Sequence, residues 1–409
     1  MSSSQGQASK SAIWWTNGIL FVTIHIAAFL GAFYHPYSIT RSATLILAFL
    51  LWQAACFGIT IGYHRLHSHK AFKIRIVPKV VLALLGASAF QGSIRWWCLR
   101  HRLHHRYTDD PIHDPYSATR GLLWSHMGWI FFKPTYERMS LIDKADLDRD
   151  AVVVWQHRHY VPLAIFTSFV FPTMVGWLWR DPLGAFIWGG LVVRVAVWHC
   201  TFLINSLAHW DGLQPYSDEN TSRTNLVLAL LTCGEGNHNF HAFPHDFRSG
   251  PAPLDWDPSK WIILLLYKLS LASRLQRARN EDLVDALSHM ADEKRHSHGD
   301  QTYEDGDLPT ISIADVYQLM KEETRTILPI EDYIIDASGY LLEHPGGAGL
   351  LHRYSLRKRG PDIEQELTQE AVLQRHEEAT WAFSGGINSH SRIAKARLRS
   401  MAIGKLVIE

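Results

Sequence analysis

The sequence predicts a mainly α-helical membrane protein with four transmembrane helices, a cytosolic helical part and a small soluble C-terminal domain. Three observations support this fold class. Four apolar segments are each long enough to cross a hydrocarbon core of about 30 Å. Histidine clusters recur at the polar edges of these segments. After residue 273 the chain becomes charged and poor in large apolar side chains, as expected for a part outside the bilayer.

Composition limits the classes of function. The 409 residues allow more than one domain. The 16 Trp gather beside the apolar segments, as membrane-interface residues do. A net charge of +1 gives no argument for binding nucleic acid, and no such partner is expected. The four scattered cysteines form no C-x-x-C pair, which excludes a zinc ribbon and favours a reducing compartment.

The membrane part follows a polar, Ser-rich N-terminus, residues 1–12, that we expect to be disordered. Two helical hairpins are predicted, with spans at 13–33, 43–61, 160–179 and 184–205. The apolar stretch 77–90 is too short to span and is expected to be interfacial or re-entrant. Lys and Arg are concentrated between the hairpins, so the positive-inside rule places this segment and both termini in the cytosol. Arg194 and His199 lie within the last span and should face protein, because lipid disfavours them.

The histidine clusters carry the chemistry. His101, His104 and His105 are spaced i, i+3 and i+4, so on a helix they share a face and should converge on one point. Imidazole binds iron, copper, zinc and nickel, which leaves the metal open. A solvated basic helix is the alternative for this cluster alone. Three further clusters favour metal binding over that alternative: His64 with His69, Asn205 with His209, and His238 with His241.

These clusters and their companions occur in a recognisable order. The segments are Gly62-Tyr63-His64-Arg65-Leu66-His67-Ser68-His69, then Gly92 to Trp97 leading into His101 to Asp109, then Asn205 to Trp210, then Gly234 to His241. In this order they resemble the histidine boxes of membrane acyl-CoA delta-9 desaturases, most closely of the fungal branch. The resemblance covers most of residues 13–270. It implies residues 13–273 as a desaturase domain with a cytosolic, helical, di-iron cap.

The resemblance also implies which residues hold the two iron ions. One iron would be bound by His64, His105, His209 and His238, and the other by His69, His101, His104 and His241, with Asn205 acting through water. His67, His113 and His126 lie outside this set. Zinc is disfavoured because it has no redox chemistry, and removing hydrogen from an unactivated methylene pair needs an oxidant made from oxygen.

The substrate class also comes from the resemblance. Such enzymes use O2 to insert a cis double bond between C9 and C10 of saturated fatty acyl-CoA of the stearoyl and palmitoyl class, in the endoplasmic reticulum membrane. The basic cytosolic loop suits a phosphate-rich head group. Gln91 and Trp97 are candidates for lining the acyl tunnel, and a plain packing role is the alternative for each.

The chain after residue 273 divides into a charged linker, 274–309, and a soluble domain, 310–409. The turn His344-Pro345-Gly346-Gly347 and the loop around His390 resemble cytochrome b5, a small α+β domain. That resemblance implies haem b with His344 and His390 as axial ligands. A haem with two histidine ligands has no free position for oxygen, so the domain should pass electrons from an NAD(P)H-dependent cytochrome b5 reductase. The stretch 353–380 makes the interval between the two histidines longer than the family pattern.

Alternatives remain open at this stage. A histidine-box lipid hydroxylase would use the same metal site, and a membrane-tethered haem protein would have a degenerate iron site. The second alternative depends on Ala242, which stands where the family pattern has a further histidine. The following Phe243-Pro244-His245 arrives one residue early, and Pro244 makes His245 a poor substitute ligand. A weakened site, a degenerate site and an omitted histidine codon each explain this, and we favour the third.

Overall fold

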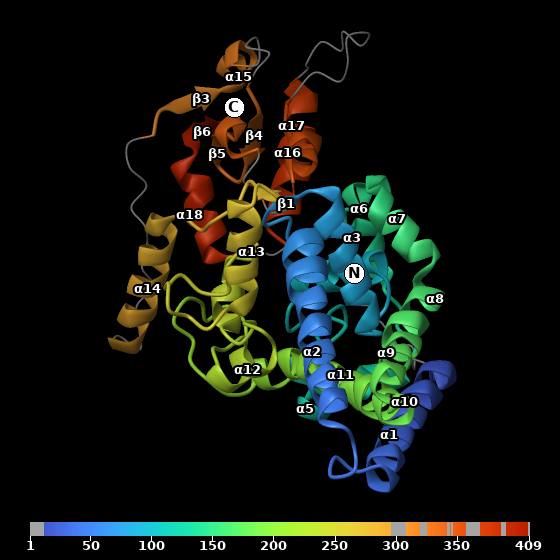
Figure 1. Ribbon diagram of the computed structural model, residues 1–409. Helices are drawn as coiled ribbons and strands as arrows, with labels where there is room; N and C mark the ends of the chain where they lie inside the picture. The colour runs from blue at the N-terminus through green and yellow to red at the C-terminus, as the bar shows by residue number, and fades with distance from the viewer. Residues whose placement is uncertain are drawn as a thin grey trace. The chain divides into compact units, whose positions relative to one another are not determined.

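The computed structural model describes residues 12–295, 308–319, 325–341, 344, 347–356, 369–385 and 390–407. The chain divides into two compact units, residues 1–283 and residues 284–409 (Figure 1). Of the predicted disordered N-terminus, residues 1–11 lie outside the described residues.

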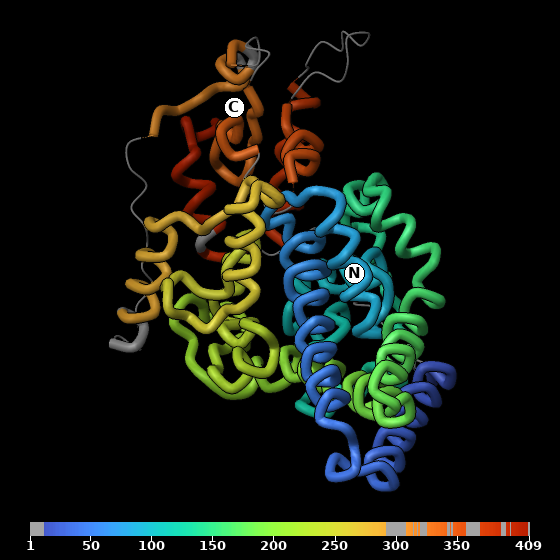
Figure 2. Tube along the Cα trace, viewed as in Figure 1, coloured from blue at the N-terminus to red at the C-terminus, as the bar shows by residue number. Residues whose placement is uncertain are grey.

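Within the described part of the chain, four helices are long and apolar enough to cross a membrane, which confirms the four predicted spans. The protein is therefore a multi-pass membrane protein. The first two spans are α1 (Trp15–Tyr34) and α2 (Ser42–Phe57), and α2 continues into the π-helix η1 (Gly58–Ser68). The backbone trace follows α2 into η1 without a break (Figure 2).

The third and fourth spans are interrupted helices. The third consists of α8 (Tyr160–Ile165), η5 (Phe166–Val170), α9 (Phe171–Gly176) and η6 (Trp177–Trp179). The fourth consists of α10 (Pro182–Gly184), η7 (Ala185–Val192), α11 (Val193–Asn205) and η8 (Leu207–His209).

One carboxylate joins the two hairpins at their turns. Asp181 Oδ1 caps α10 by accepting a hydrogen bond from the Gly184 backbone N–H at 3.0 Å. Its Oδ2 accepts from Thr44 Oγ1 at 2.7 Å and from the Arg41 N–H at 3.1 Å at the start of α2. These bonds satisfy backbone donors that the helix starts leave unpaired, so Asp181 fixes the two hairpins to each other.

The segment after η1 folds back against it. Helix α3 (Ile76–Ser88) is the short apolar helix predicted at 77–90, and it packs on η1. The two helices approach so closely that a Cβ on Gly58 would lie 2.2 Å from the Gly86 nitrogen. Helix α4 (Ile94–Arg106) follows, and Ser93 caps it by accepting a hydrogen bond from the Trp96 N–H. Glycine at this crossing therefore lets the backbones of η1 and α3 pack in direct contact.

Short elements complete the first unit. They are β1 (Lys73–Ile74), η2 (Ala118–Arg120), α5 (Leu122–His126), η3 (Gly128–Phe131), η4 (Glu137–Leu141), α6 (Ala145–Arg149), α7 (Ala151–Arg158), α12 (Leu226–Leu231), η9 (His238–Ala242), α13 (Pro258–Lys268) and β2 (Ala272–Ser273), which pairs antiparallel with β1. Helix α13 buries Ile263 and exposes Trp261 and Leu265.

The second unit has the α+β character predicted for the C-terminal domain. Its strands β3 (Thr310–Ser312), β4 (Ile327–Ile330), β5 (Tyr333–Asp336) and β6 (Ala402–Val407) form a sheet in the order β3-β6-β5-β4, with β3 and β6 parallel and the other pairs antiparallel. Its helices are α15 (Ile313–Leu319), η10 (Ser338–Tyr340), α16 (Ala348–Tyr354), α17 (Gln369–Phe383) and α18 (Arg392–Ser400). Within this unit Leu328, Ile335, Phe383 and Leu398 pack in one core. This arrangement is consistent with a cytochrome b5-like domain.

In the C-terminal region the structure differs from one prediction, and part of a second predicted feature lies outside the described residues. The segment predicted as a charged linker, 274–309, contains the helix α14 (Asn280–Arg295). Of the predicted long interval between the two haem histidines, residues 357–368 lie outside the described residues.

Candidate metal centre

A π-helical turn explains the spacing of the first histidine cluster. The His69 backbone N–H donates to the His64 carbonyl oxygen at 3.1 Å, an i to i+5 hydrogen bond. In a π-helix residues five apart lie on one face, whereas in an α-helix they diverge. The two imidazole rings consequently face each other, with centroids 4.7 Å apart.

The second cluster is divided by helix geometry. His101 and His105, one α-helical turn apart on α4, lie with their Nε2 atoms 3.1 Å from each other. His104 turns away toward Asp114, whose Oδ1 lies 2.8 Å from His104 Nδ1. The expectation that all three imidazoles converge on one point is therefore wrong, because His104 belongs to a second group.

The first group gathers five imidazoles from three elements. Its members are His64, His69, His101, His105 and His241, and each offers a ring nitrogen within 4.8 Å of all the others. The Nε2 atoms of His64 and His241 are 3.0 Å apart, and those of His69 and His101 are 2.8 Å apart. Burial, and then the neighbouring imidazoles, lower the pKa of His69, His101, His105 and His241 well below the usual value. These rings are therefore neutral, and their lone pairs are available to a cation.

The second group joins His104 to His209 and His238. Thr221 Oγ1 donates to Asp109 Oδ1 at 2.9 Å, so it accepts from His209 Nδ1, which lies 2.9 Å away. This leaves the lone pair on His209 Nε2, a buried atom with no hydrogen-bond partner among the described residues. A buried nitrogen without a partner beside two other imidazoles fits a bound metal ion.

Both groups contain only residues named from the sequence, but the structure divides them differently. The resemblance gave sets of four and four, with His104 beside His101 and His105 beside His209. The structure gives five and three. Asn205 lies on the wall of the adjoining cavity together with His238. Among the residues that the structure describes, His67, His113, His126 and His245 belong to neither group.

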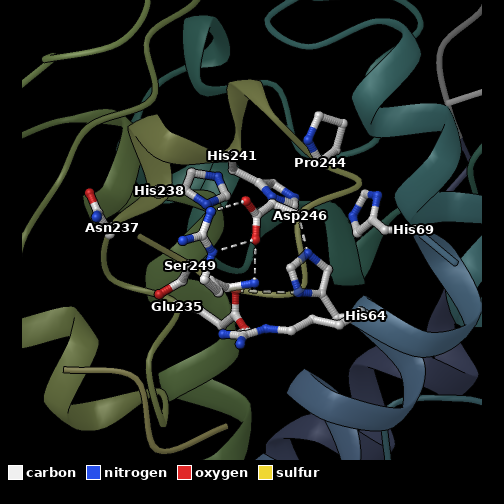
Figure 3. A pocket seen from close by; sticks show the side chains of 11 residues that line it. His64, His69, Glu235, Asn237, His238, His241, Pro244, Asp246 and Ser249 are labelled. Carbon is white, nitrogen blue, oxygen red and sulfur yellow. Dashed lines mark hydrogen bonds and ion pairs between the residues drawn. The ribbon is translucent and has the colours of Figure 1, made fainter. Parts of the chain in front are cut away.

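A buried ion network supports His64. Arg65 bonds Glu235 Oε1 at 2.8 Å and Asp257 Oδ2 at 2.9 Å, and the second Glu235 oxygen lies 3.3 Å from His64 Nδ1. Burial raises the pKa of Glu235, but the charge of Arg65 and the hydrogen bonds from His64 and Arg65 outweigh it and lower the pKa to about 2. Glu235 therefore stays ionised and holds His64 with Nε2 directed at the first group. Figure 3 shows His64, His69, His238 and His241 around the pocket that Glu235 also lines.

Sequence reasoning missed the side chains that orient the imidazoles. Asp114, Thr221 and Glu235 contact ring nitrogens of His104, His209 and His64 respectively. Such partners fix which ring nitrogen carries the proton. The available signal was weak, since an acidic or hydroxyl residue near a histidine cluster is common and only folding shows which one makes contact.

A cavity adjoins both groups. Its wall includes His64 and His101 of the first group and His238 of the second. Trp97, which the sequence analysis proposed for the acyl tunnel, also lies on this wall, and its ring stacks on His101 at a centroid distance of 4.8 Å. The wall combines apolar side chains such as Ile59 and Ile204 with polar ones such as Asn205 and Glu235, a combination that ligand sites use. Gln91 lies behind this wall, where its Nε2 donates to Thr201 Oγ1 at 2.8 Å.

The polar residues within the last span face protein, as predicted. Arg194 is 1% exposed. His199 bonds His25 Nε2 through its Nε2 at 3.0 Å and His126 Nε2 through its Nδ1 at 2.8 Å. Since the two contacts use different nitrogens of His199, these rings form a chain of hydrogen bonds and not a third convergent group.

The two predicted haem histidines are oriented by backbone carbonyls. His344 Nδ1 lies 3.3 Å from the Gly347 oxygen, and His390 Nδ1 lies 2.8 Å from the Phe383 oxygen. In His344 this leaves Nε2 for another partner. Burial and the nearby His390 together lower the pKa of His344 to about 4. Pro345, Gly346 and residues 386–389 of the predicted motifs lie outside the described residues.

Comparison with known proteins agrees with this geometry. Residues 42–245 match the family model described as fatty acid desaturase. The "Probable acyl-CoA desaturase" of Schizosaccharomyces pombe is 35% identical over 382 residues, 92% of this chain and 74% of the relative. "Acyl-CoA desaturase 1" of Saccharomyces cerevisiae is 36% identical over 350 residues, 85% of this chain and 64% of the relative. Human "Stearoyl-CoA desaturase 5" is 32% identical over 278 residues, 66% of this chain and 83% of the relative. The chain belongs to the fatty acid desaturase family.

Proposed function

We propose that this chain is a delta-9 acyl-CoA desaturase that inserts a cis double bond between C9 and C10 of saturated fatty acyl-CoA of the stearoyl and palmitoyl class. The observation that supports this most is that two imidazole groups adjoin one cavity whose wall includes the apolar side chains of Cys56, Ile59 and Trp97. A cavity of this kind suits an acyl chain. Relatives from two fungi and from animals carry acyl-CoA, stearoyl-CoA or delta-9 desaturase in their names.

The cofactors we propose for the membrane unit are two iron ions. The residues that would hold them are His64, His69, His101, His105 and His241 in one group and His104, His209 and His238 in the other, with Asn205 contributing through water. Clustered imidazoles whose ring nitrogens lie within 4.8 Å of one another in each group fit divalent iron. When bound, the iron pair supplies the oxidant, derived from O2, that removes two hydrogens from an unactivated methylene pair.

The protein's own side chains hold and shield the reacting groups. Asp114, Thr221 and Glu235 fix ring orientation, so that ligand nitrogens are in place before substrate arrives. The apolar part of the cavity wall includes Cys56, Ile59 and Trp97. This part of the wall excludes water from the acyl chain. O2 accepts four electrons in all, two from the C–H bonds that are lost and two from an external donor, and two protons complete two waters.

The external electrons, we propose, come through haem b held by His344 and His390. Two histidine ligands leave no open position, so the haem transfers electrons without binding oxygen. An NAD(P)H-dependent cytochrome b5 reductase would reduce it. Because the haem domain is part of the same chain, its effective concentration at the metal centre depends on the connecting segment, 274–309, and not on free diffusion.

The proposed location is the endoplasmic reticulum membrane, with both termini in the cytosol. Lys and Arg gather between the two hairpins, which supports a cytosolic position for that segment. Protease added outside sealed microsomal vesicles should digest the C-terminal unit. Protection of that unit until detergent is added would contradict the orientation.

The reaction is tested by product analysis. The chain is expressed in cells that lack their own desaturase, with saturated fatty acid as the precursor, and lipids are analysed by mass spectrometry. A loss of two hydrogens with the double bond between C9 and C10 is expected. A gain of one oxygen would instead identify the hydroxylase alternative. Saturated lipids alone, from a chain that carries haem but lacks non-haem iron, would identify the membrane-tethered haem protein.

A further inference from the structure

We infer that the two metal positions of this chain are unequal: five imidazoles retain one metal ion firmly, whereas three imidazoles hold the other, which exchanges first. The inference rests on the proposed function only in treating both groups as metal sites. It concerns metal retention and does not depend on which product is formed.

His241 decides the division. Its Nε2 lies 3.0 Å from His64 Nε2, and its ring centroid is 4.4 Å from that of His105 and 4.6 Å from that of His69. The His238 ring stacks on it at 5.5 Å, but the ligand nitrogen of His238 groups with those of His104 and His209. His241 therefore completes the five-imidazole group and is not available to the three-imidazole group.

The short helix η9 gives the physical reason. His238, the first residue of η9, is buried and belongs to the three-imidazole group, while His241, one 3-10 turn later, belongs to the five-imidazole group. The next residue is Ala242, whose methyl group cannot bind a metal. Phe240 and Phe243 are buried on either side and anchor this turn, so His241 alone reaches the five-imidazole group from η9.

The three-imidazole group is well oriented but open. Asp114 and Thr221 hold the Nδ1 atoms of His104 and His209, which directs the Nε2 lone pairs inward. His209 Nε2 is buried and has no hydrogen-bond partner among the described residues. Three imidazoles leave at least one coordination position of a metal ion to water or to an exogenous ligand, as in catalytic sites generally. Fewer protein ligands also mean fewer metal–ligand bonds that must break before the ion leaves.

The experiment follows the release of non-haem iron. The full chain, purified in detergent and loaded with Fe²⁺ without oxygen, is mixed with a colorimetric chelator that does not react with haem. We expect two irons per chain, released in two phases of equal amplitude whose rates differ by about tenfold or more. Release of both irons in one phase would overturn the inference.

Variants assign the phases. His209→Ala should remove the fast phase and leave the slow one, whereas His64→Ala should accelerate the slow phase. Loss of both irons in His209→Ala, with the circular dichroism spectrum unchanged, would contradict the inference. If His209→Ala does not fold, His238→Ala replaces it, with the same expectation. His113→Gln is the matched control, because His113 bonds Asp110 and lies outside both groups.

An insertion tests the role of position 242 directly. A histidine inserted after His241 should supply the missing imidazole and bring the two rates together, while an alanine inserted at the same place should not. Equal rates in the original chain, or no change on histidine insertion, would show that the unequal division is wrong. The proposed function fails separately: two-phase release from a chain that forms no unsaturated product would sustain the unequal sites and reject the desaturase.

Discussion

The two units of the chain use histidine in opposite ways. In residues 1–283 eight imidazoles converge in groups of five and three, and their outer nitrogens meet charged or hydroxyl side chains such as Asp114, Thr221 and Glu235. In residues 284–409 two imidazoles are each held by one backbone carbonyl, from Gly347 and Phe383.

The difference matches the chemistry of what each arrangement can hold. Several convergent lone pairs suit small cations, and carboxylate partners increase the electron density that the imidazoles offer them. Two isolated imidazoles with neutral partners suit a group that brings its own equatorial ligands, as a haem does. Ligand number and the partner on Nδ1 thus separate a metal-ion site from a haem site. Each of the following changes tests one side of this separation.

The largest expected effect is the complete loss of haem. His344→Ala or His390→Ala should abolish the absorption spectrum of a haem with two histidine ligands, because one axial bond is removed. Non-haem iron in the first unit should remain at two per chain, and desaturation should recover in part with an added soluble electron donor. Loss of the non-haem iron in either variant would show that the two sites are not separate.

The next effect is on the stability of the first unit. Arg65→Ala leaves the buried carboxylates of Glu235 and Asp257 without their cation, which should cost about 3–5 kcal/mol of unfolding free energy. Thermal melting in detergent, followed by circular dichroism, measures it. Arg95→Ala is the control, because its ion pair with Asp148 is partly exposed and should contribute less than about 1 kcal/mol. Equal melting temperatures for the two variants would argue against the buried network.

A smaller effect is expected from a partner of one imidazole. Asp114→Asn keeps the size of the side chain but removes the negative charge beside His104 Nδ1. Iron affinity at the three-imidazole group should fall about 10–100-fold, while the five-imidazole group keeps its iron. Chelator competition at equilibrium measures both affinities. If iron affinity fell at the five-imidazole group instead, our assignment of His104 to the three-imidazole group would be wrong.

The smallest effect concerns the cavity wall. Trp97→Phe removes part of an aromatic wall beside His101 and should change the relative kcat/KM for two acyl-CoA chain lengths by about 1–3 kcal/mol. Gln91→Leu should change it less, because Gln91 lies behind Thr201. Competition between two acyl-CoA substrates, with products separated by mass, measures the ratio. A larger effect from Gln91→Leu than from Trp97→Phe would show that Gln91, and not Trp97, contacts the acyl chain.

The fold was predictable where one physical rule dominates. Four spans could be located because a bilayer requires about 20 apolar residues per helix. The individual histidines could be named because the family resemblance rests on residue type and order. Their grouping could not, since it depends on the rotation of each ring about its helix. The π-helical turn between His64 and His69 and the division of α4 at His104 both arise from hydrogen bonds to partners that spacing does not reveal.

Distance along the chain also limited the prediction. Glu235 lies 170 residues from Arg65, and Thr221 lies 12 residues from His209, yet both contacts orient ligands. The helix α14 was likewise missed within the charged segment 274–309, because its composition favours a solvated linker. In each case the decisive information is which distant segment becomes a neighbour.

The cysteines of the first unit give the cavity an internal chemical reporter. All four are buried, but only Cys56 and Cys200 lie on the described cavity wall, whereas Cys98 and Cys233 do not. A small uncharged alkylating reagent that enters the cavity should modify the first pair and spare the second. A bound acyl chain should then protect the peptides that contain Cys56 and Cys200 from alkylation, as measured by mass spectrometry. The other two thiols serve as internal references. Occupancy of the cavity can thus be measured on the unaltered chain, even in a preparation that does not turn over.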